Sequence, residues 1–243
     1  MAINPEKLKV SLRQAIALFW ETRERQSTAQ RHRGSRDQGR RAAVTGGAQM
    51  NGFINLIGEI VRDAGIPDAA IYTKQRLELP GYYRATKNWD MLVVVDGTLL
   101  VVIEAKSQVG SFGNNFNNRT EEAIGSAVDL WTAFREGALS NSSRPWLGYL
   151  FLLEDSEKSR KPVSVREPHF CVFEEFRDAS YCQRYEILLR KLVRERHYEA
   201  AAFLTSNARS GLRGEFLEPA IDLSFKNFAT SLTAHASAFA DMR

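Results

Sequence analysis

The chain has 243 residues, of which 44% are apolar and 26% are charged, with 33 Lys and Arg against 29 Asp and Glu. This composition excludes a disordered or fibrous protein, and the two cysteines, Cys171 and Cys182, are too few for a disulfide framework. The longest apolar runs are far shorter than the ~20 residues that a membrane-spanning helix needs, so we expect a cytoplasmic protein without a membrane segment.

The N-terminal part of the chain carries the excess positive charge. Residues 1–50 hold ten Lys and Arg and four Asp and Glu, a net charge of +6, whereas the other residues hold 23 and 25, a net charge of −2. Apolar residues at helical spacing predict a helix over 5–30, and the stretch 31–47, rich in Arg, Gly and Ser, is typical of a loop. The basic loop segment as a whole is assigned to 22–47. This segment is either a contact for a polyanion or a solvated surface.

The rest of the chain alternates between helical and strand patterns. We predict helices at 48–64, 120–139, 184–196 and 225–239, strands at 71–79, 90–95, 99–106, 146–153 and 169–173, and a polar loop at 107–118. Several of these strands are apolar on both faces, which is typical of a sheet covered by helices on both sides. We therefore expect one α/β domain over 1–243, with a mixed central sheet flanked by helices.

Three ionisable residues lie at the ends of otherwise apolar strands. Asp90 comes directly before the run Met91–Val95, and Glu104 and Lys106 lie at the end of the next run. Burying such charges costs several kcal/mol unless they are paired or neutralised by a metal ion. Glu104 and Lys106 are two positions apart, so they point to the same face of one strand.

The turn at Asp96-Gly97 decides whether Asp90 joins them. A two-residue turn places Asp90 opposite Ile103, facing away from Glu104. A three-residue loop with Gly97 in a left-handed bulge position places Asp90 on the same face as Glu104 and diagonal to it. We predict the bulged loop, because glycine tolerates that position. A strict two-residue turn would contradict this prediction unless a bulge elsewhere restores the alternation.

Two carboxylates and the backbone carbonyl of Ala105 would form an oxygen site of the kind that Mg²⁺ accepts. Lys106 beside that ion could hold or deprotonate an attacking water, and the set fits hydrolysis of a phosphodiester. The alternative is a structural ion pair of Glu104 and Lys106 with Asp90.

The order of these elements resembles the core of the PD-(D/E)XK nucleases: a helix, a strand, a strand that starts with Asp, a strand that bears Glu-x-Lys, and a helix. Asn88-Trp89-Asp90 stands where Pro-Asp is usual in those enzymes. Over roughly residues 10–200 the chain is similar to the XhoI-type restriction endonucleases, in the runs VTGGAQMNGF, LPGYYRATKNWD, IEAKSQVGSFGNNFNNRTEEAIG and LLEDSEKSR.

The resemblance implies a homodimeric type II restriction endonuclease of bacteria. Such an enzyme uses Mg²⁺ to cut double-stranded DNA at the palindrome CTCGAG after its first C, and leaves 5′-phosphate ends. Asp90, Glu104 and Lys106 carry over by motif as the catalytic residues. The candidate metal ligands are Asp90, Glu104, Ala105 and Glu59. Some members of the PD-(D/E)XK fold add a Glu from the preceding helix, and Glu59 at that place would reach the metal through a water or be an ordinary solvated residue.

Contacts to bases and phosphates are expected from side-chain chemistry, not from the motif. Asn pairs with adenine and Arg with guanine, so the candidate base readers are Asn114, Asn115, Asn117, Asn118 and Arg119. Asn118 could instead cap the following helix. The candidate phosphate contacts, or otherwise solvated residues, are Lys87, Lys158 and Arg160. A two-fold dimer is the simplest reader of a palindrome.

Two other functions stay open at this point. One is a repair or junction nuclease of the same fold, which would not cut a plasmid into discrete fragments. The other is a non-catalytic DNA-binding regulator, which would bind DNA in Mg²⁺ without cutting it.

Overall fold

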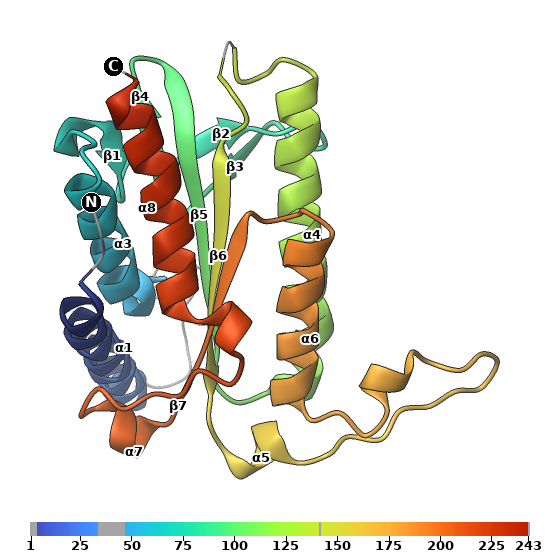
Figure 1. The fold of residues 1–243 in the computed structure, drawn as a ribbon. Coiled ribbons are helices and arrows are strands. Elements are labelled where there is room, and N and C mark those ends of the chain that lie inside the picture. Colours follow the sequence, from blue (N-terminus) through green and yellow to red (C-terminus); the bar gives the residue numbers. More distant parts are fainter. Residues whose placement is uncertain (1–3, 34–46, 141, 243) are drawn as a thin grey trace.

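A five-stranded mixed sheet forms the centre of the protein (Figure 1). The computed structural model describes residues 4–33, 47–140 and 142–242. In spatial order the strands are β1 (Ile71–Tyr72), β4 (Met91–Val95), β5 (Thr98–Gln108), β6 (Trp146–Glu154) and β7 (Ala200–Ser206). The pairs β1–β4 and β4–β5 are antiparallel, and β5–β6 and β6–β7 are parallel. A separate two-stranded ribbon pairs β2 (Glu78–Pro80) with β3 (Thr86–Asn88).

Helices cover both faces of this sheet (Figure 1). One face carries α1 (Pro5–Arg33), α3 (Asn51–Asp63) and α8 (Phe225–Asp241), and the other carries α4 (Phe112–Arg135) and α6 (Tyr181–Arg194). The shorter elements are α5 (Glu157–Arg160), α7 (Ala208–Gly211) and the 3-10 turns η1 (Ala48–Met50), η2 (Asp68–Ala70), η3 (Glu174–Phe176) and η4 (Ile221–Leu223). The expected α/β class, with a mixed sheet flanked by helices, is confirmed.

Strand β5 builds both hydrophobic cores of the protein. Val101 and Ile103 pack into the core beneath α1, α3 and α8, whereas Leu99 and Val102 pack into the core beneath α4 and α6. Alternate residues of a strand point to opposite faces, and each buried side chain of this size contributes roughly 1.5–3 kcal/mol. A charged residue in such a strand is therefore held in place by apolar neighbours on both sides.

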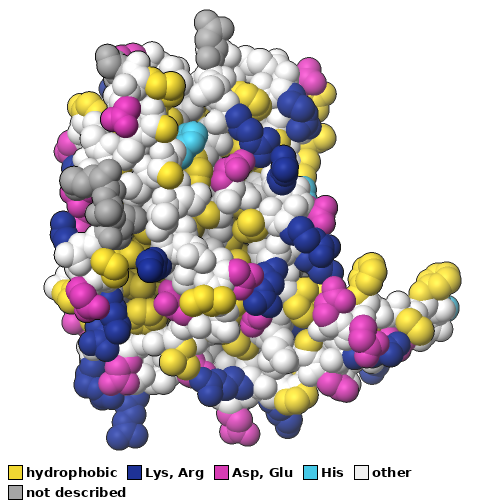
Figure 2. Space-filling view, viewed as in Figure 1, with side chains coloured by type: hydrophobic (Ala, Val, Ile, Leu, Met, Phe, Trp, Pro, Cys, Tyr) yellow, Lys and Arg dark blue, Asp and Glu magenta, His cyan; other side chains and the backbone are white. Residues whose placement is uncertain are grey.

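The structure corrects two of the predicted strands and adds one that the sequence did not predict. Residues 71–79 are not one strand, because Arg76 adopts a left-handed conformation (φ 56°) between β1 and β2. Residues 169–173 form no strand; they lie on an excursion away from the sheet (Figure 1), which carries hydrophobic side chains on its surface (Figure 2). Phe170 and Phe173 are exposed. Strand β7 was not predicted, since its Ala-rich sequence forms a strand only through parallel pairing with β6.

The basic segment predicted as a loop over 22–47 is partly helical. Helix α1 continues to Arg33, so residues 22–33 are not a loop, and residues 34–46 lie outside the described part of the chain. Leu12, Ile16 and Phe19 bury one side of α1, and the residues after them include good helix formers that extend it. In the part of the chain that the structure describes, no helix has the length and apolarity that a bilayer span requires.

Helix α4 begins at Phe112, not near Thr120 as predicted. The ring of Phe112 stacks on Tyr181 with centroids 6.0 Å apart, and Phe116 meets Tyr185 edge-on at 5.1 Å. These two aromatic residues at i and i+4 dock the first turns of α4 on α6. The Asn-rich stretch is therefore helical, and Asn118 does not cap the helix.

Candidate active site

A two-residue turn joins β4 to β5, so the predicted three-residue loop is wrong. Val95 pairs with Thr98 across Asp96-Gly97, and the two turn residues have φ angles of 49° and 80°. Positive φ at both positions defines a type I′ turn, whose twist matches that of the flanking strands. That match explains why the chain adopts the shorter turn.

A β-bulge restores the alternation that the short turn would otherwise break. The register shifts after Val93, which pairs with Val101, and Leu100 is the extra residue. Three steps further along this ladder, Asp90 lies opposite Glu104, on the face that α4 covers. The expected placement of both carboxylates on one face is confirmed, although by a different route.

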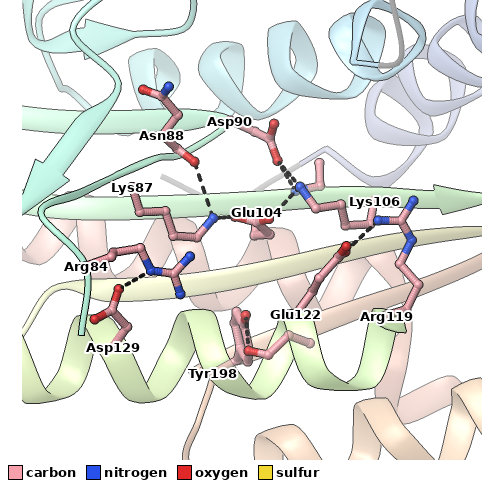
Figure 3. Close-up of polar contacts among 12 residues, drawn as sticks. Arg84, Lys87, Asn88, Asp90, Glu104, Lys106, Arg119, Glu122, Asp129 and Tyr198 are labelled. Carbon is pink, nitrogen blue, oxygen red and sulfur yellow. Dashed lines mark hydrogen bonds and ion pairs between the residues drawn. The ribbon is translucent and has the colours of Figure 1, made fainter. Parts of the chain in front are cut away.

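Asp90, Glu104 and Lys106 converge at the N-terminal end of β4 (Figure 3). Lys106 Nζ lies 2.5 Å from Glu104 Oε1 and 3.5 Å from Asp90 Oδ2. The backbone N–H of Ala105 donates to Asp90 Oδ2 at 2.8 Å. Glu104 is only 3% exposed, whereas the side chains of Asp90 and Lys106 are 32% and 26% exposed. The cluster is therefore buried at Glu104 and open to solvent at Asp90 and Lys106.

Lys87 of β3 adds a second ammonium group to this cluster. Its Nζ lies 2.8 Å from Glu104 Oε2 and 4.2 Å from the centre of the Trp89 ring, and its side chain is 12% exposed. Both oxygens of Glu104 are thus paired with a lysine. We predicted a phosphate contact for Lys87 but no role next to Glu104. The only sequence signal for that role is its position three residues before Asp90.

Burial disfavours each charge in the cluster; it sets the direction of the pKa shift for Asp90, whereas neighbouring charges outweigh it for Glu104 and Lys106. Burial raises the pKa of Asp90, the charge of Glu104 adds to this effect, and Lys106 only partly offsets it. Burial would raise the pKa of Glu104, but Lys106 and Lys87 hold it below its usual value. Burial would lower the pKa of Lys106, but Glu104 and Asp90 hold it above its usual value.

The oxygen atoms at this edge of β5 fit a hard divalent cation. The N–H and C=O of a strand residue lie on the same edge of the strand, so the Ala105 carbonyl faces the end of β4, as its N–H does. Mg²⁺ is commonly bound by one or two carboxylates and keeps several waters. Asp90, Glu104 and the Ala105 carbonyl match that donor set. Across residues 4–33, 47–140 and 142–242 no group of three or more His, Cys, Asp and Glu side chains could hold a metal ion.

The structure does not bring Glu59 to this cluster. Glu59 is exposed on α3, and α3 packs on the face of the sheet opposite to the one that Glu104 occupies. Its position fits the solvated alternative.

The five candidate base readers occupy the first turns of α4. Asn114, Asn117 and Asn118 are exposed, whereas Asn115 donates from its side chain to the Ser111 carbonyl. Arg119, the fifth candidate, pairs with Glu122 at 2.6 Å. Its Nε is buried and has no hydrogen-bond partner among the described residues. The helix thus presents three free amides to solvent and a partly buried arginine near the cluster (Figure 3).

Lys158 and Arg160 lie on α5, beyond the end of β6. Both side chains are exposed, and Arg160 forms an ion pair with Asp155. The structure does not bring them to the cluster around Asp90 and Glu104, called the acidic cluster below, so they could contact only DNA that extends beyond it.

Comparison with known proteins confirms the resemblance found in the sequence. The family model "Restriction endonuclease XhoI" matches residues 29–218. The type II restriction enzyme BstVI of Geobacillus stearothermophilus is 51% identical over 208 residues, which are 83% of this chain and 93% of that enzyme. The type II restriction enzyme XhoI of Xanthomonas vasicola is 49% identical over 197 residues, 79% and 78% of the two chains. AbrI of Azospirillum brasilense is 46% identical over 172 residues, 70% and 77% of the two chains. No solved structure matches the chain significantly.

Proposed function

Because the chain belongs to the XhoI family of restriction endonucleases, we propose that it cuts double-stranded DNA at CTCGAG after the first C, with Mg²⁺ as cofactor. Type II restriction enzymes are site-specific deoxyribonucleases, so family membership makes this chain a hydrolase of that class. The products that we propose carry 5′-phosphate ends. The observation that carries this proposal is the convergence of Asp90, Glu104 and Lys106 at one edge of the sheet.

The proposed fold is that of the PD-(D/E)XK nucleases, in a single domain over residues 1–243. The order α3, β1, β4, β5, α4 supports it, since β4 follows Asp90 and β5 bears Glu104 and Lys106. Both hydrophobic cores also share one sheet, which supports a single domain.

The carboxylates of Asp90 and Glu104 and the carbonyl of Ala105 would hold the Mg²⁺. A bound divalent ion lowers the pKa of its water and stabilises charge on a phosphate. The ammonium of Lys106, held between the two carboxylates, would orient the attacking water toward the phosphorus. The burial of Glu104 keeps its carboxylate in one orientation, which favours a fixed geometry for that attack.

Base recognition is proposed for the start of α4. An α-helix fits the major groove of B-DNA, where side-chain amides pair with adenine and guanidinium groups with guanine. The proposed readers are Asn114, Asn115, Asn117, Asn118 and Arg119. The proposed phosphate contacts outside the cluster are Lys158 and Arg160.

The proposed assembly is a homodimer, because a palindrome presents the same half-site twice and a two-fold protein reads both halves with the same residues. The proposed location is the bacterial cytoplasm, where the DNA substrate is found.

Digestion of a plasmid of known sequence tests this proposal. With Mg²⁺ we expect discrete fragments, whose sequenced ends place each cut after the first C of CTCGAG, and we expect intact plasmid in EDTA. A smear of fragments would indicate a repair or junction nuclease of the same fold. A gel shift without cleavage in Mg²⁺ would indicate a DNA-binding regulator.

A further inference from the structure

The loop between β2 and β3 is held by a buried carboxylate of α4. Asp129 Oδ1 accepts hydrogen bonds from the backbone N–H groups of Tyr82 and Tyr83, each at 2.8 Å. Its other oxygen lies 2.8 Å from Nε of Arg84. A buried carboxylate is costly unless its oxygens are bonded, and here three donors satisfy it. The loop is thus fixed at three consecutive residues.

The first residue of this loop must be glycine for it to approach Asp129 so closely. A Cβ atom on Gly81 would lie 2.7 Å from the Arg84 carbonyl oxygen and 2.8 Å from Asp129 Oδ2. Neither atom can move freely, because one belongs to the backbone and the other to a carboxylate whose two oxygens together are held by three donors. The sequence and the packing therefore both fix the conformation of this loop.

This fixed loop presents two aromatic rings to solvent. The residues Tyr82 and Tyr83 are 53% and 69% exposed, and their rings meet edge-on with centroids 5.0 Å apart. Among the described residues, the other exposed large aromatic rings are those of Phe170 and Phe173, on the excursion before α6. Holding two large rings in water while anchoring their backbone brings no stability to the fold, and this arrangement is typical of a contact surface.

The surroundings of the two rings are basic. Residues 73–88 contain four basic residues, Lys74, Arg76, Arg84 and Lys87, and one acidic residue, Glu78. Arg84 and Lys87 pair with Asp129 and Glu104, so the exposed Lys74 and Arg76 are the cations of this ribbon that a phosphate would meet. Aromatic rings beside basic side chains are the combination that binds nucleic acid, since the rings stack on bases and the cations pair with phosphates. The charge of this ribbon therefore favours DNA over an acidic or apolar protein surface as the partner.

The ribbon is continuous with the candidate active site. Lys87, four residues after Tyr83, pairs with Glu104, and Asp129 lies two helical turns from Glu122, the partner of Arg119. Figure 3 shows Asp129 and Glu122 on the same stretch of α4, and the cluster of Asp90, Glu104 and Lys106 at the strands that this helix covers. DNA bound at Asp90 and Glu104 would pass next to this loop.

We propose that Tyr82 and Tyr83 contact the DNA beside the scissile phosphate, and that Asp129 positions them for this contact. The inference rests on the proposed function, because it takes DNA as the ligand of the acidic cluster. Fixing the loop before binding reduces the conformational entropy that the two rings lose on contact.

DNA affinity of the double variant Tyr82→Ala, Tyr83→Ala tests the contact. Binding to a fluorescent duplex with one CTCGAG site is measured by anisotropy in Ca²⁺. We expect the variant to bind roughly 5- to 150-fold more weakly, the range for loss of one stacked base. The variant Tyr82→Phe, Tyr83→Phe keeps the rings and should bind within about threefold of the parent. Ile221→Ala, an exposed residue at the β7 edge of the sheet, serves as the matched control and should bind like the parent.

Photocrosslinking tests the contact without removing a ring. p-Azidophenylalanine in place of Tyr83 should crosslink to the duplex, and the same probe in place of Ile221 should not. Equal affinity of the Ala double variant and the parent, together with no crosslink at 83, would overturn the inference. A change from dimer to monomer in the Ala double variant, again without a crosslink, would overturn it in favour of a protein interface.

The failure of this inference differs from that of the proposed function. A parent protein that cuts at CTCGAG while both tyrosine tests fail leaves the proposed function intact. A parent that binds no DNA, or binds it without cutting in Mg²⁺, contradicts the proposed function instead. Asp129→Asn should weaken DNA binding in the same direction as the Ala double variant, and Tyr82→Phe, Tyr83→Phe should not, which separates positioning from loss of the rings.

Discussion

Glu104 is the residue on which the candidate site depends, because it is almost fully buried and yet both of its oxygens face an ammonium group. We expect Glu104→Ala to lower the rate of Mg²⁺-dependent cleavage by roughly 10²- to 10³-fold, the order of effect of removing one group that stabilises transition-state charge. DNA binding should stay measurable. Single-turnover cleavage of a duplex with one site measures the rate.

Glu59→Gln is the matched control for this change. Glu59 is an exposed carboxylate on α3, on the other side of the sheet, so its variant should cut at the parent rate. Parent-level cleavage by Glu104→Ala would show that the chemistry takes place elsewhere.

Lys87 stabilises the fold by pairing with that buried carboxylate. Lys87→Met leaves one oxygen of Glu104 without its partner, which should reduce the free energy of unfolding by about 1–3 kcal/mol at pH 7. Urea unfolding measures the change. Lys7→Met removes an exposed pair with Asp63 and should change the free energy of unfolding by no more than about 0.5 kcal/mol.

Because Lys87 pairs with a titratable carboxylate, the loss of stability in Lys87→Met should depend on pH. Lys106 and Lys87 outweigh burial and hold the pKa of Glu104 below its value in the unfolded chain. Their contribution to stability is therefore fully present above the unfolded pKa of about 4.3 and is lost as the pH falls through the folded pKa. The difference between the parent and Lys87→Met should shrink below about pH 4.3, and a difference that grew there would contradict the pairing.

At the scale of elements, the β4–β5 hairpin contains two departures from regular pairing that compensate each other. The two-residue turn alone would place Asp90 and Glu104 on opposite faces, and the extra residue Leu100 restores them to one face. The sequence analysis predicted the shared face from a three-residue turn, so the face was right and the turn was wrong. It could not locate the bulge, because Leu99, Leu100 and Val101 are all apolar and differ only in what they pack against.

Two glycines allow the turn and the following helix to be tested with the same substitution. Gly97 has a φ of 80° and open space around its missing Cβ, so Gly97→Ala should destabilise the protein by about 1–2 kcal/mol through backbone strain alone. Gly125 lies within α4, also with open space, so Gly125→Ala should stabilise it by about 0.5–1 kcal/mol. Thermal or urea unfolding measures both changes in stability, which should have opposite signs. Destabilisation by Gly125→Ala would contradict the helical assignment there.

The start of α4 shows how tertiary packing overrides a local pattern. Four Asn in five positions predict a loop, since Asn favours turns and caps. Phe112 and Phe116 nevertheless dock on Tyr181 and Tyr185, which lie far away in the sequence. The exposed Asn side chains consequently project from a helix and not from a loop.

At the scale of the whole molecule, the proposed homodimer would place one active site on each strand of the palindrome. A heterodimer of one parent subunit and one Glu104→Ala subunit, isolated with two different affinity tags, should nick a supercoiled plasmid that holds one site. The doubly tagged parent should linearise the same plasmid. Agarose gels separate nicked from linear DNA, and linear product from the heterodimer at the parent rate would contradict one active site per strand.

The sequence by itself determined the α/β class, the family and the identity of the acid–acid–lysine set. These properties depend on local alternation and on short motifs, which are visible in one dimension. Only the tertiary structure decided that Lys87 pairs with Glu104, that Glu59 lies on the other side of the sheet, and that Asp129 fixes Tyr82 and Tyr83. Each of these depends on where distant segments meet, and that is set by the packing of helices and ribbon on the sheet, which no local pattern encodes.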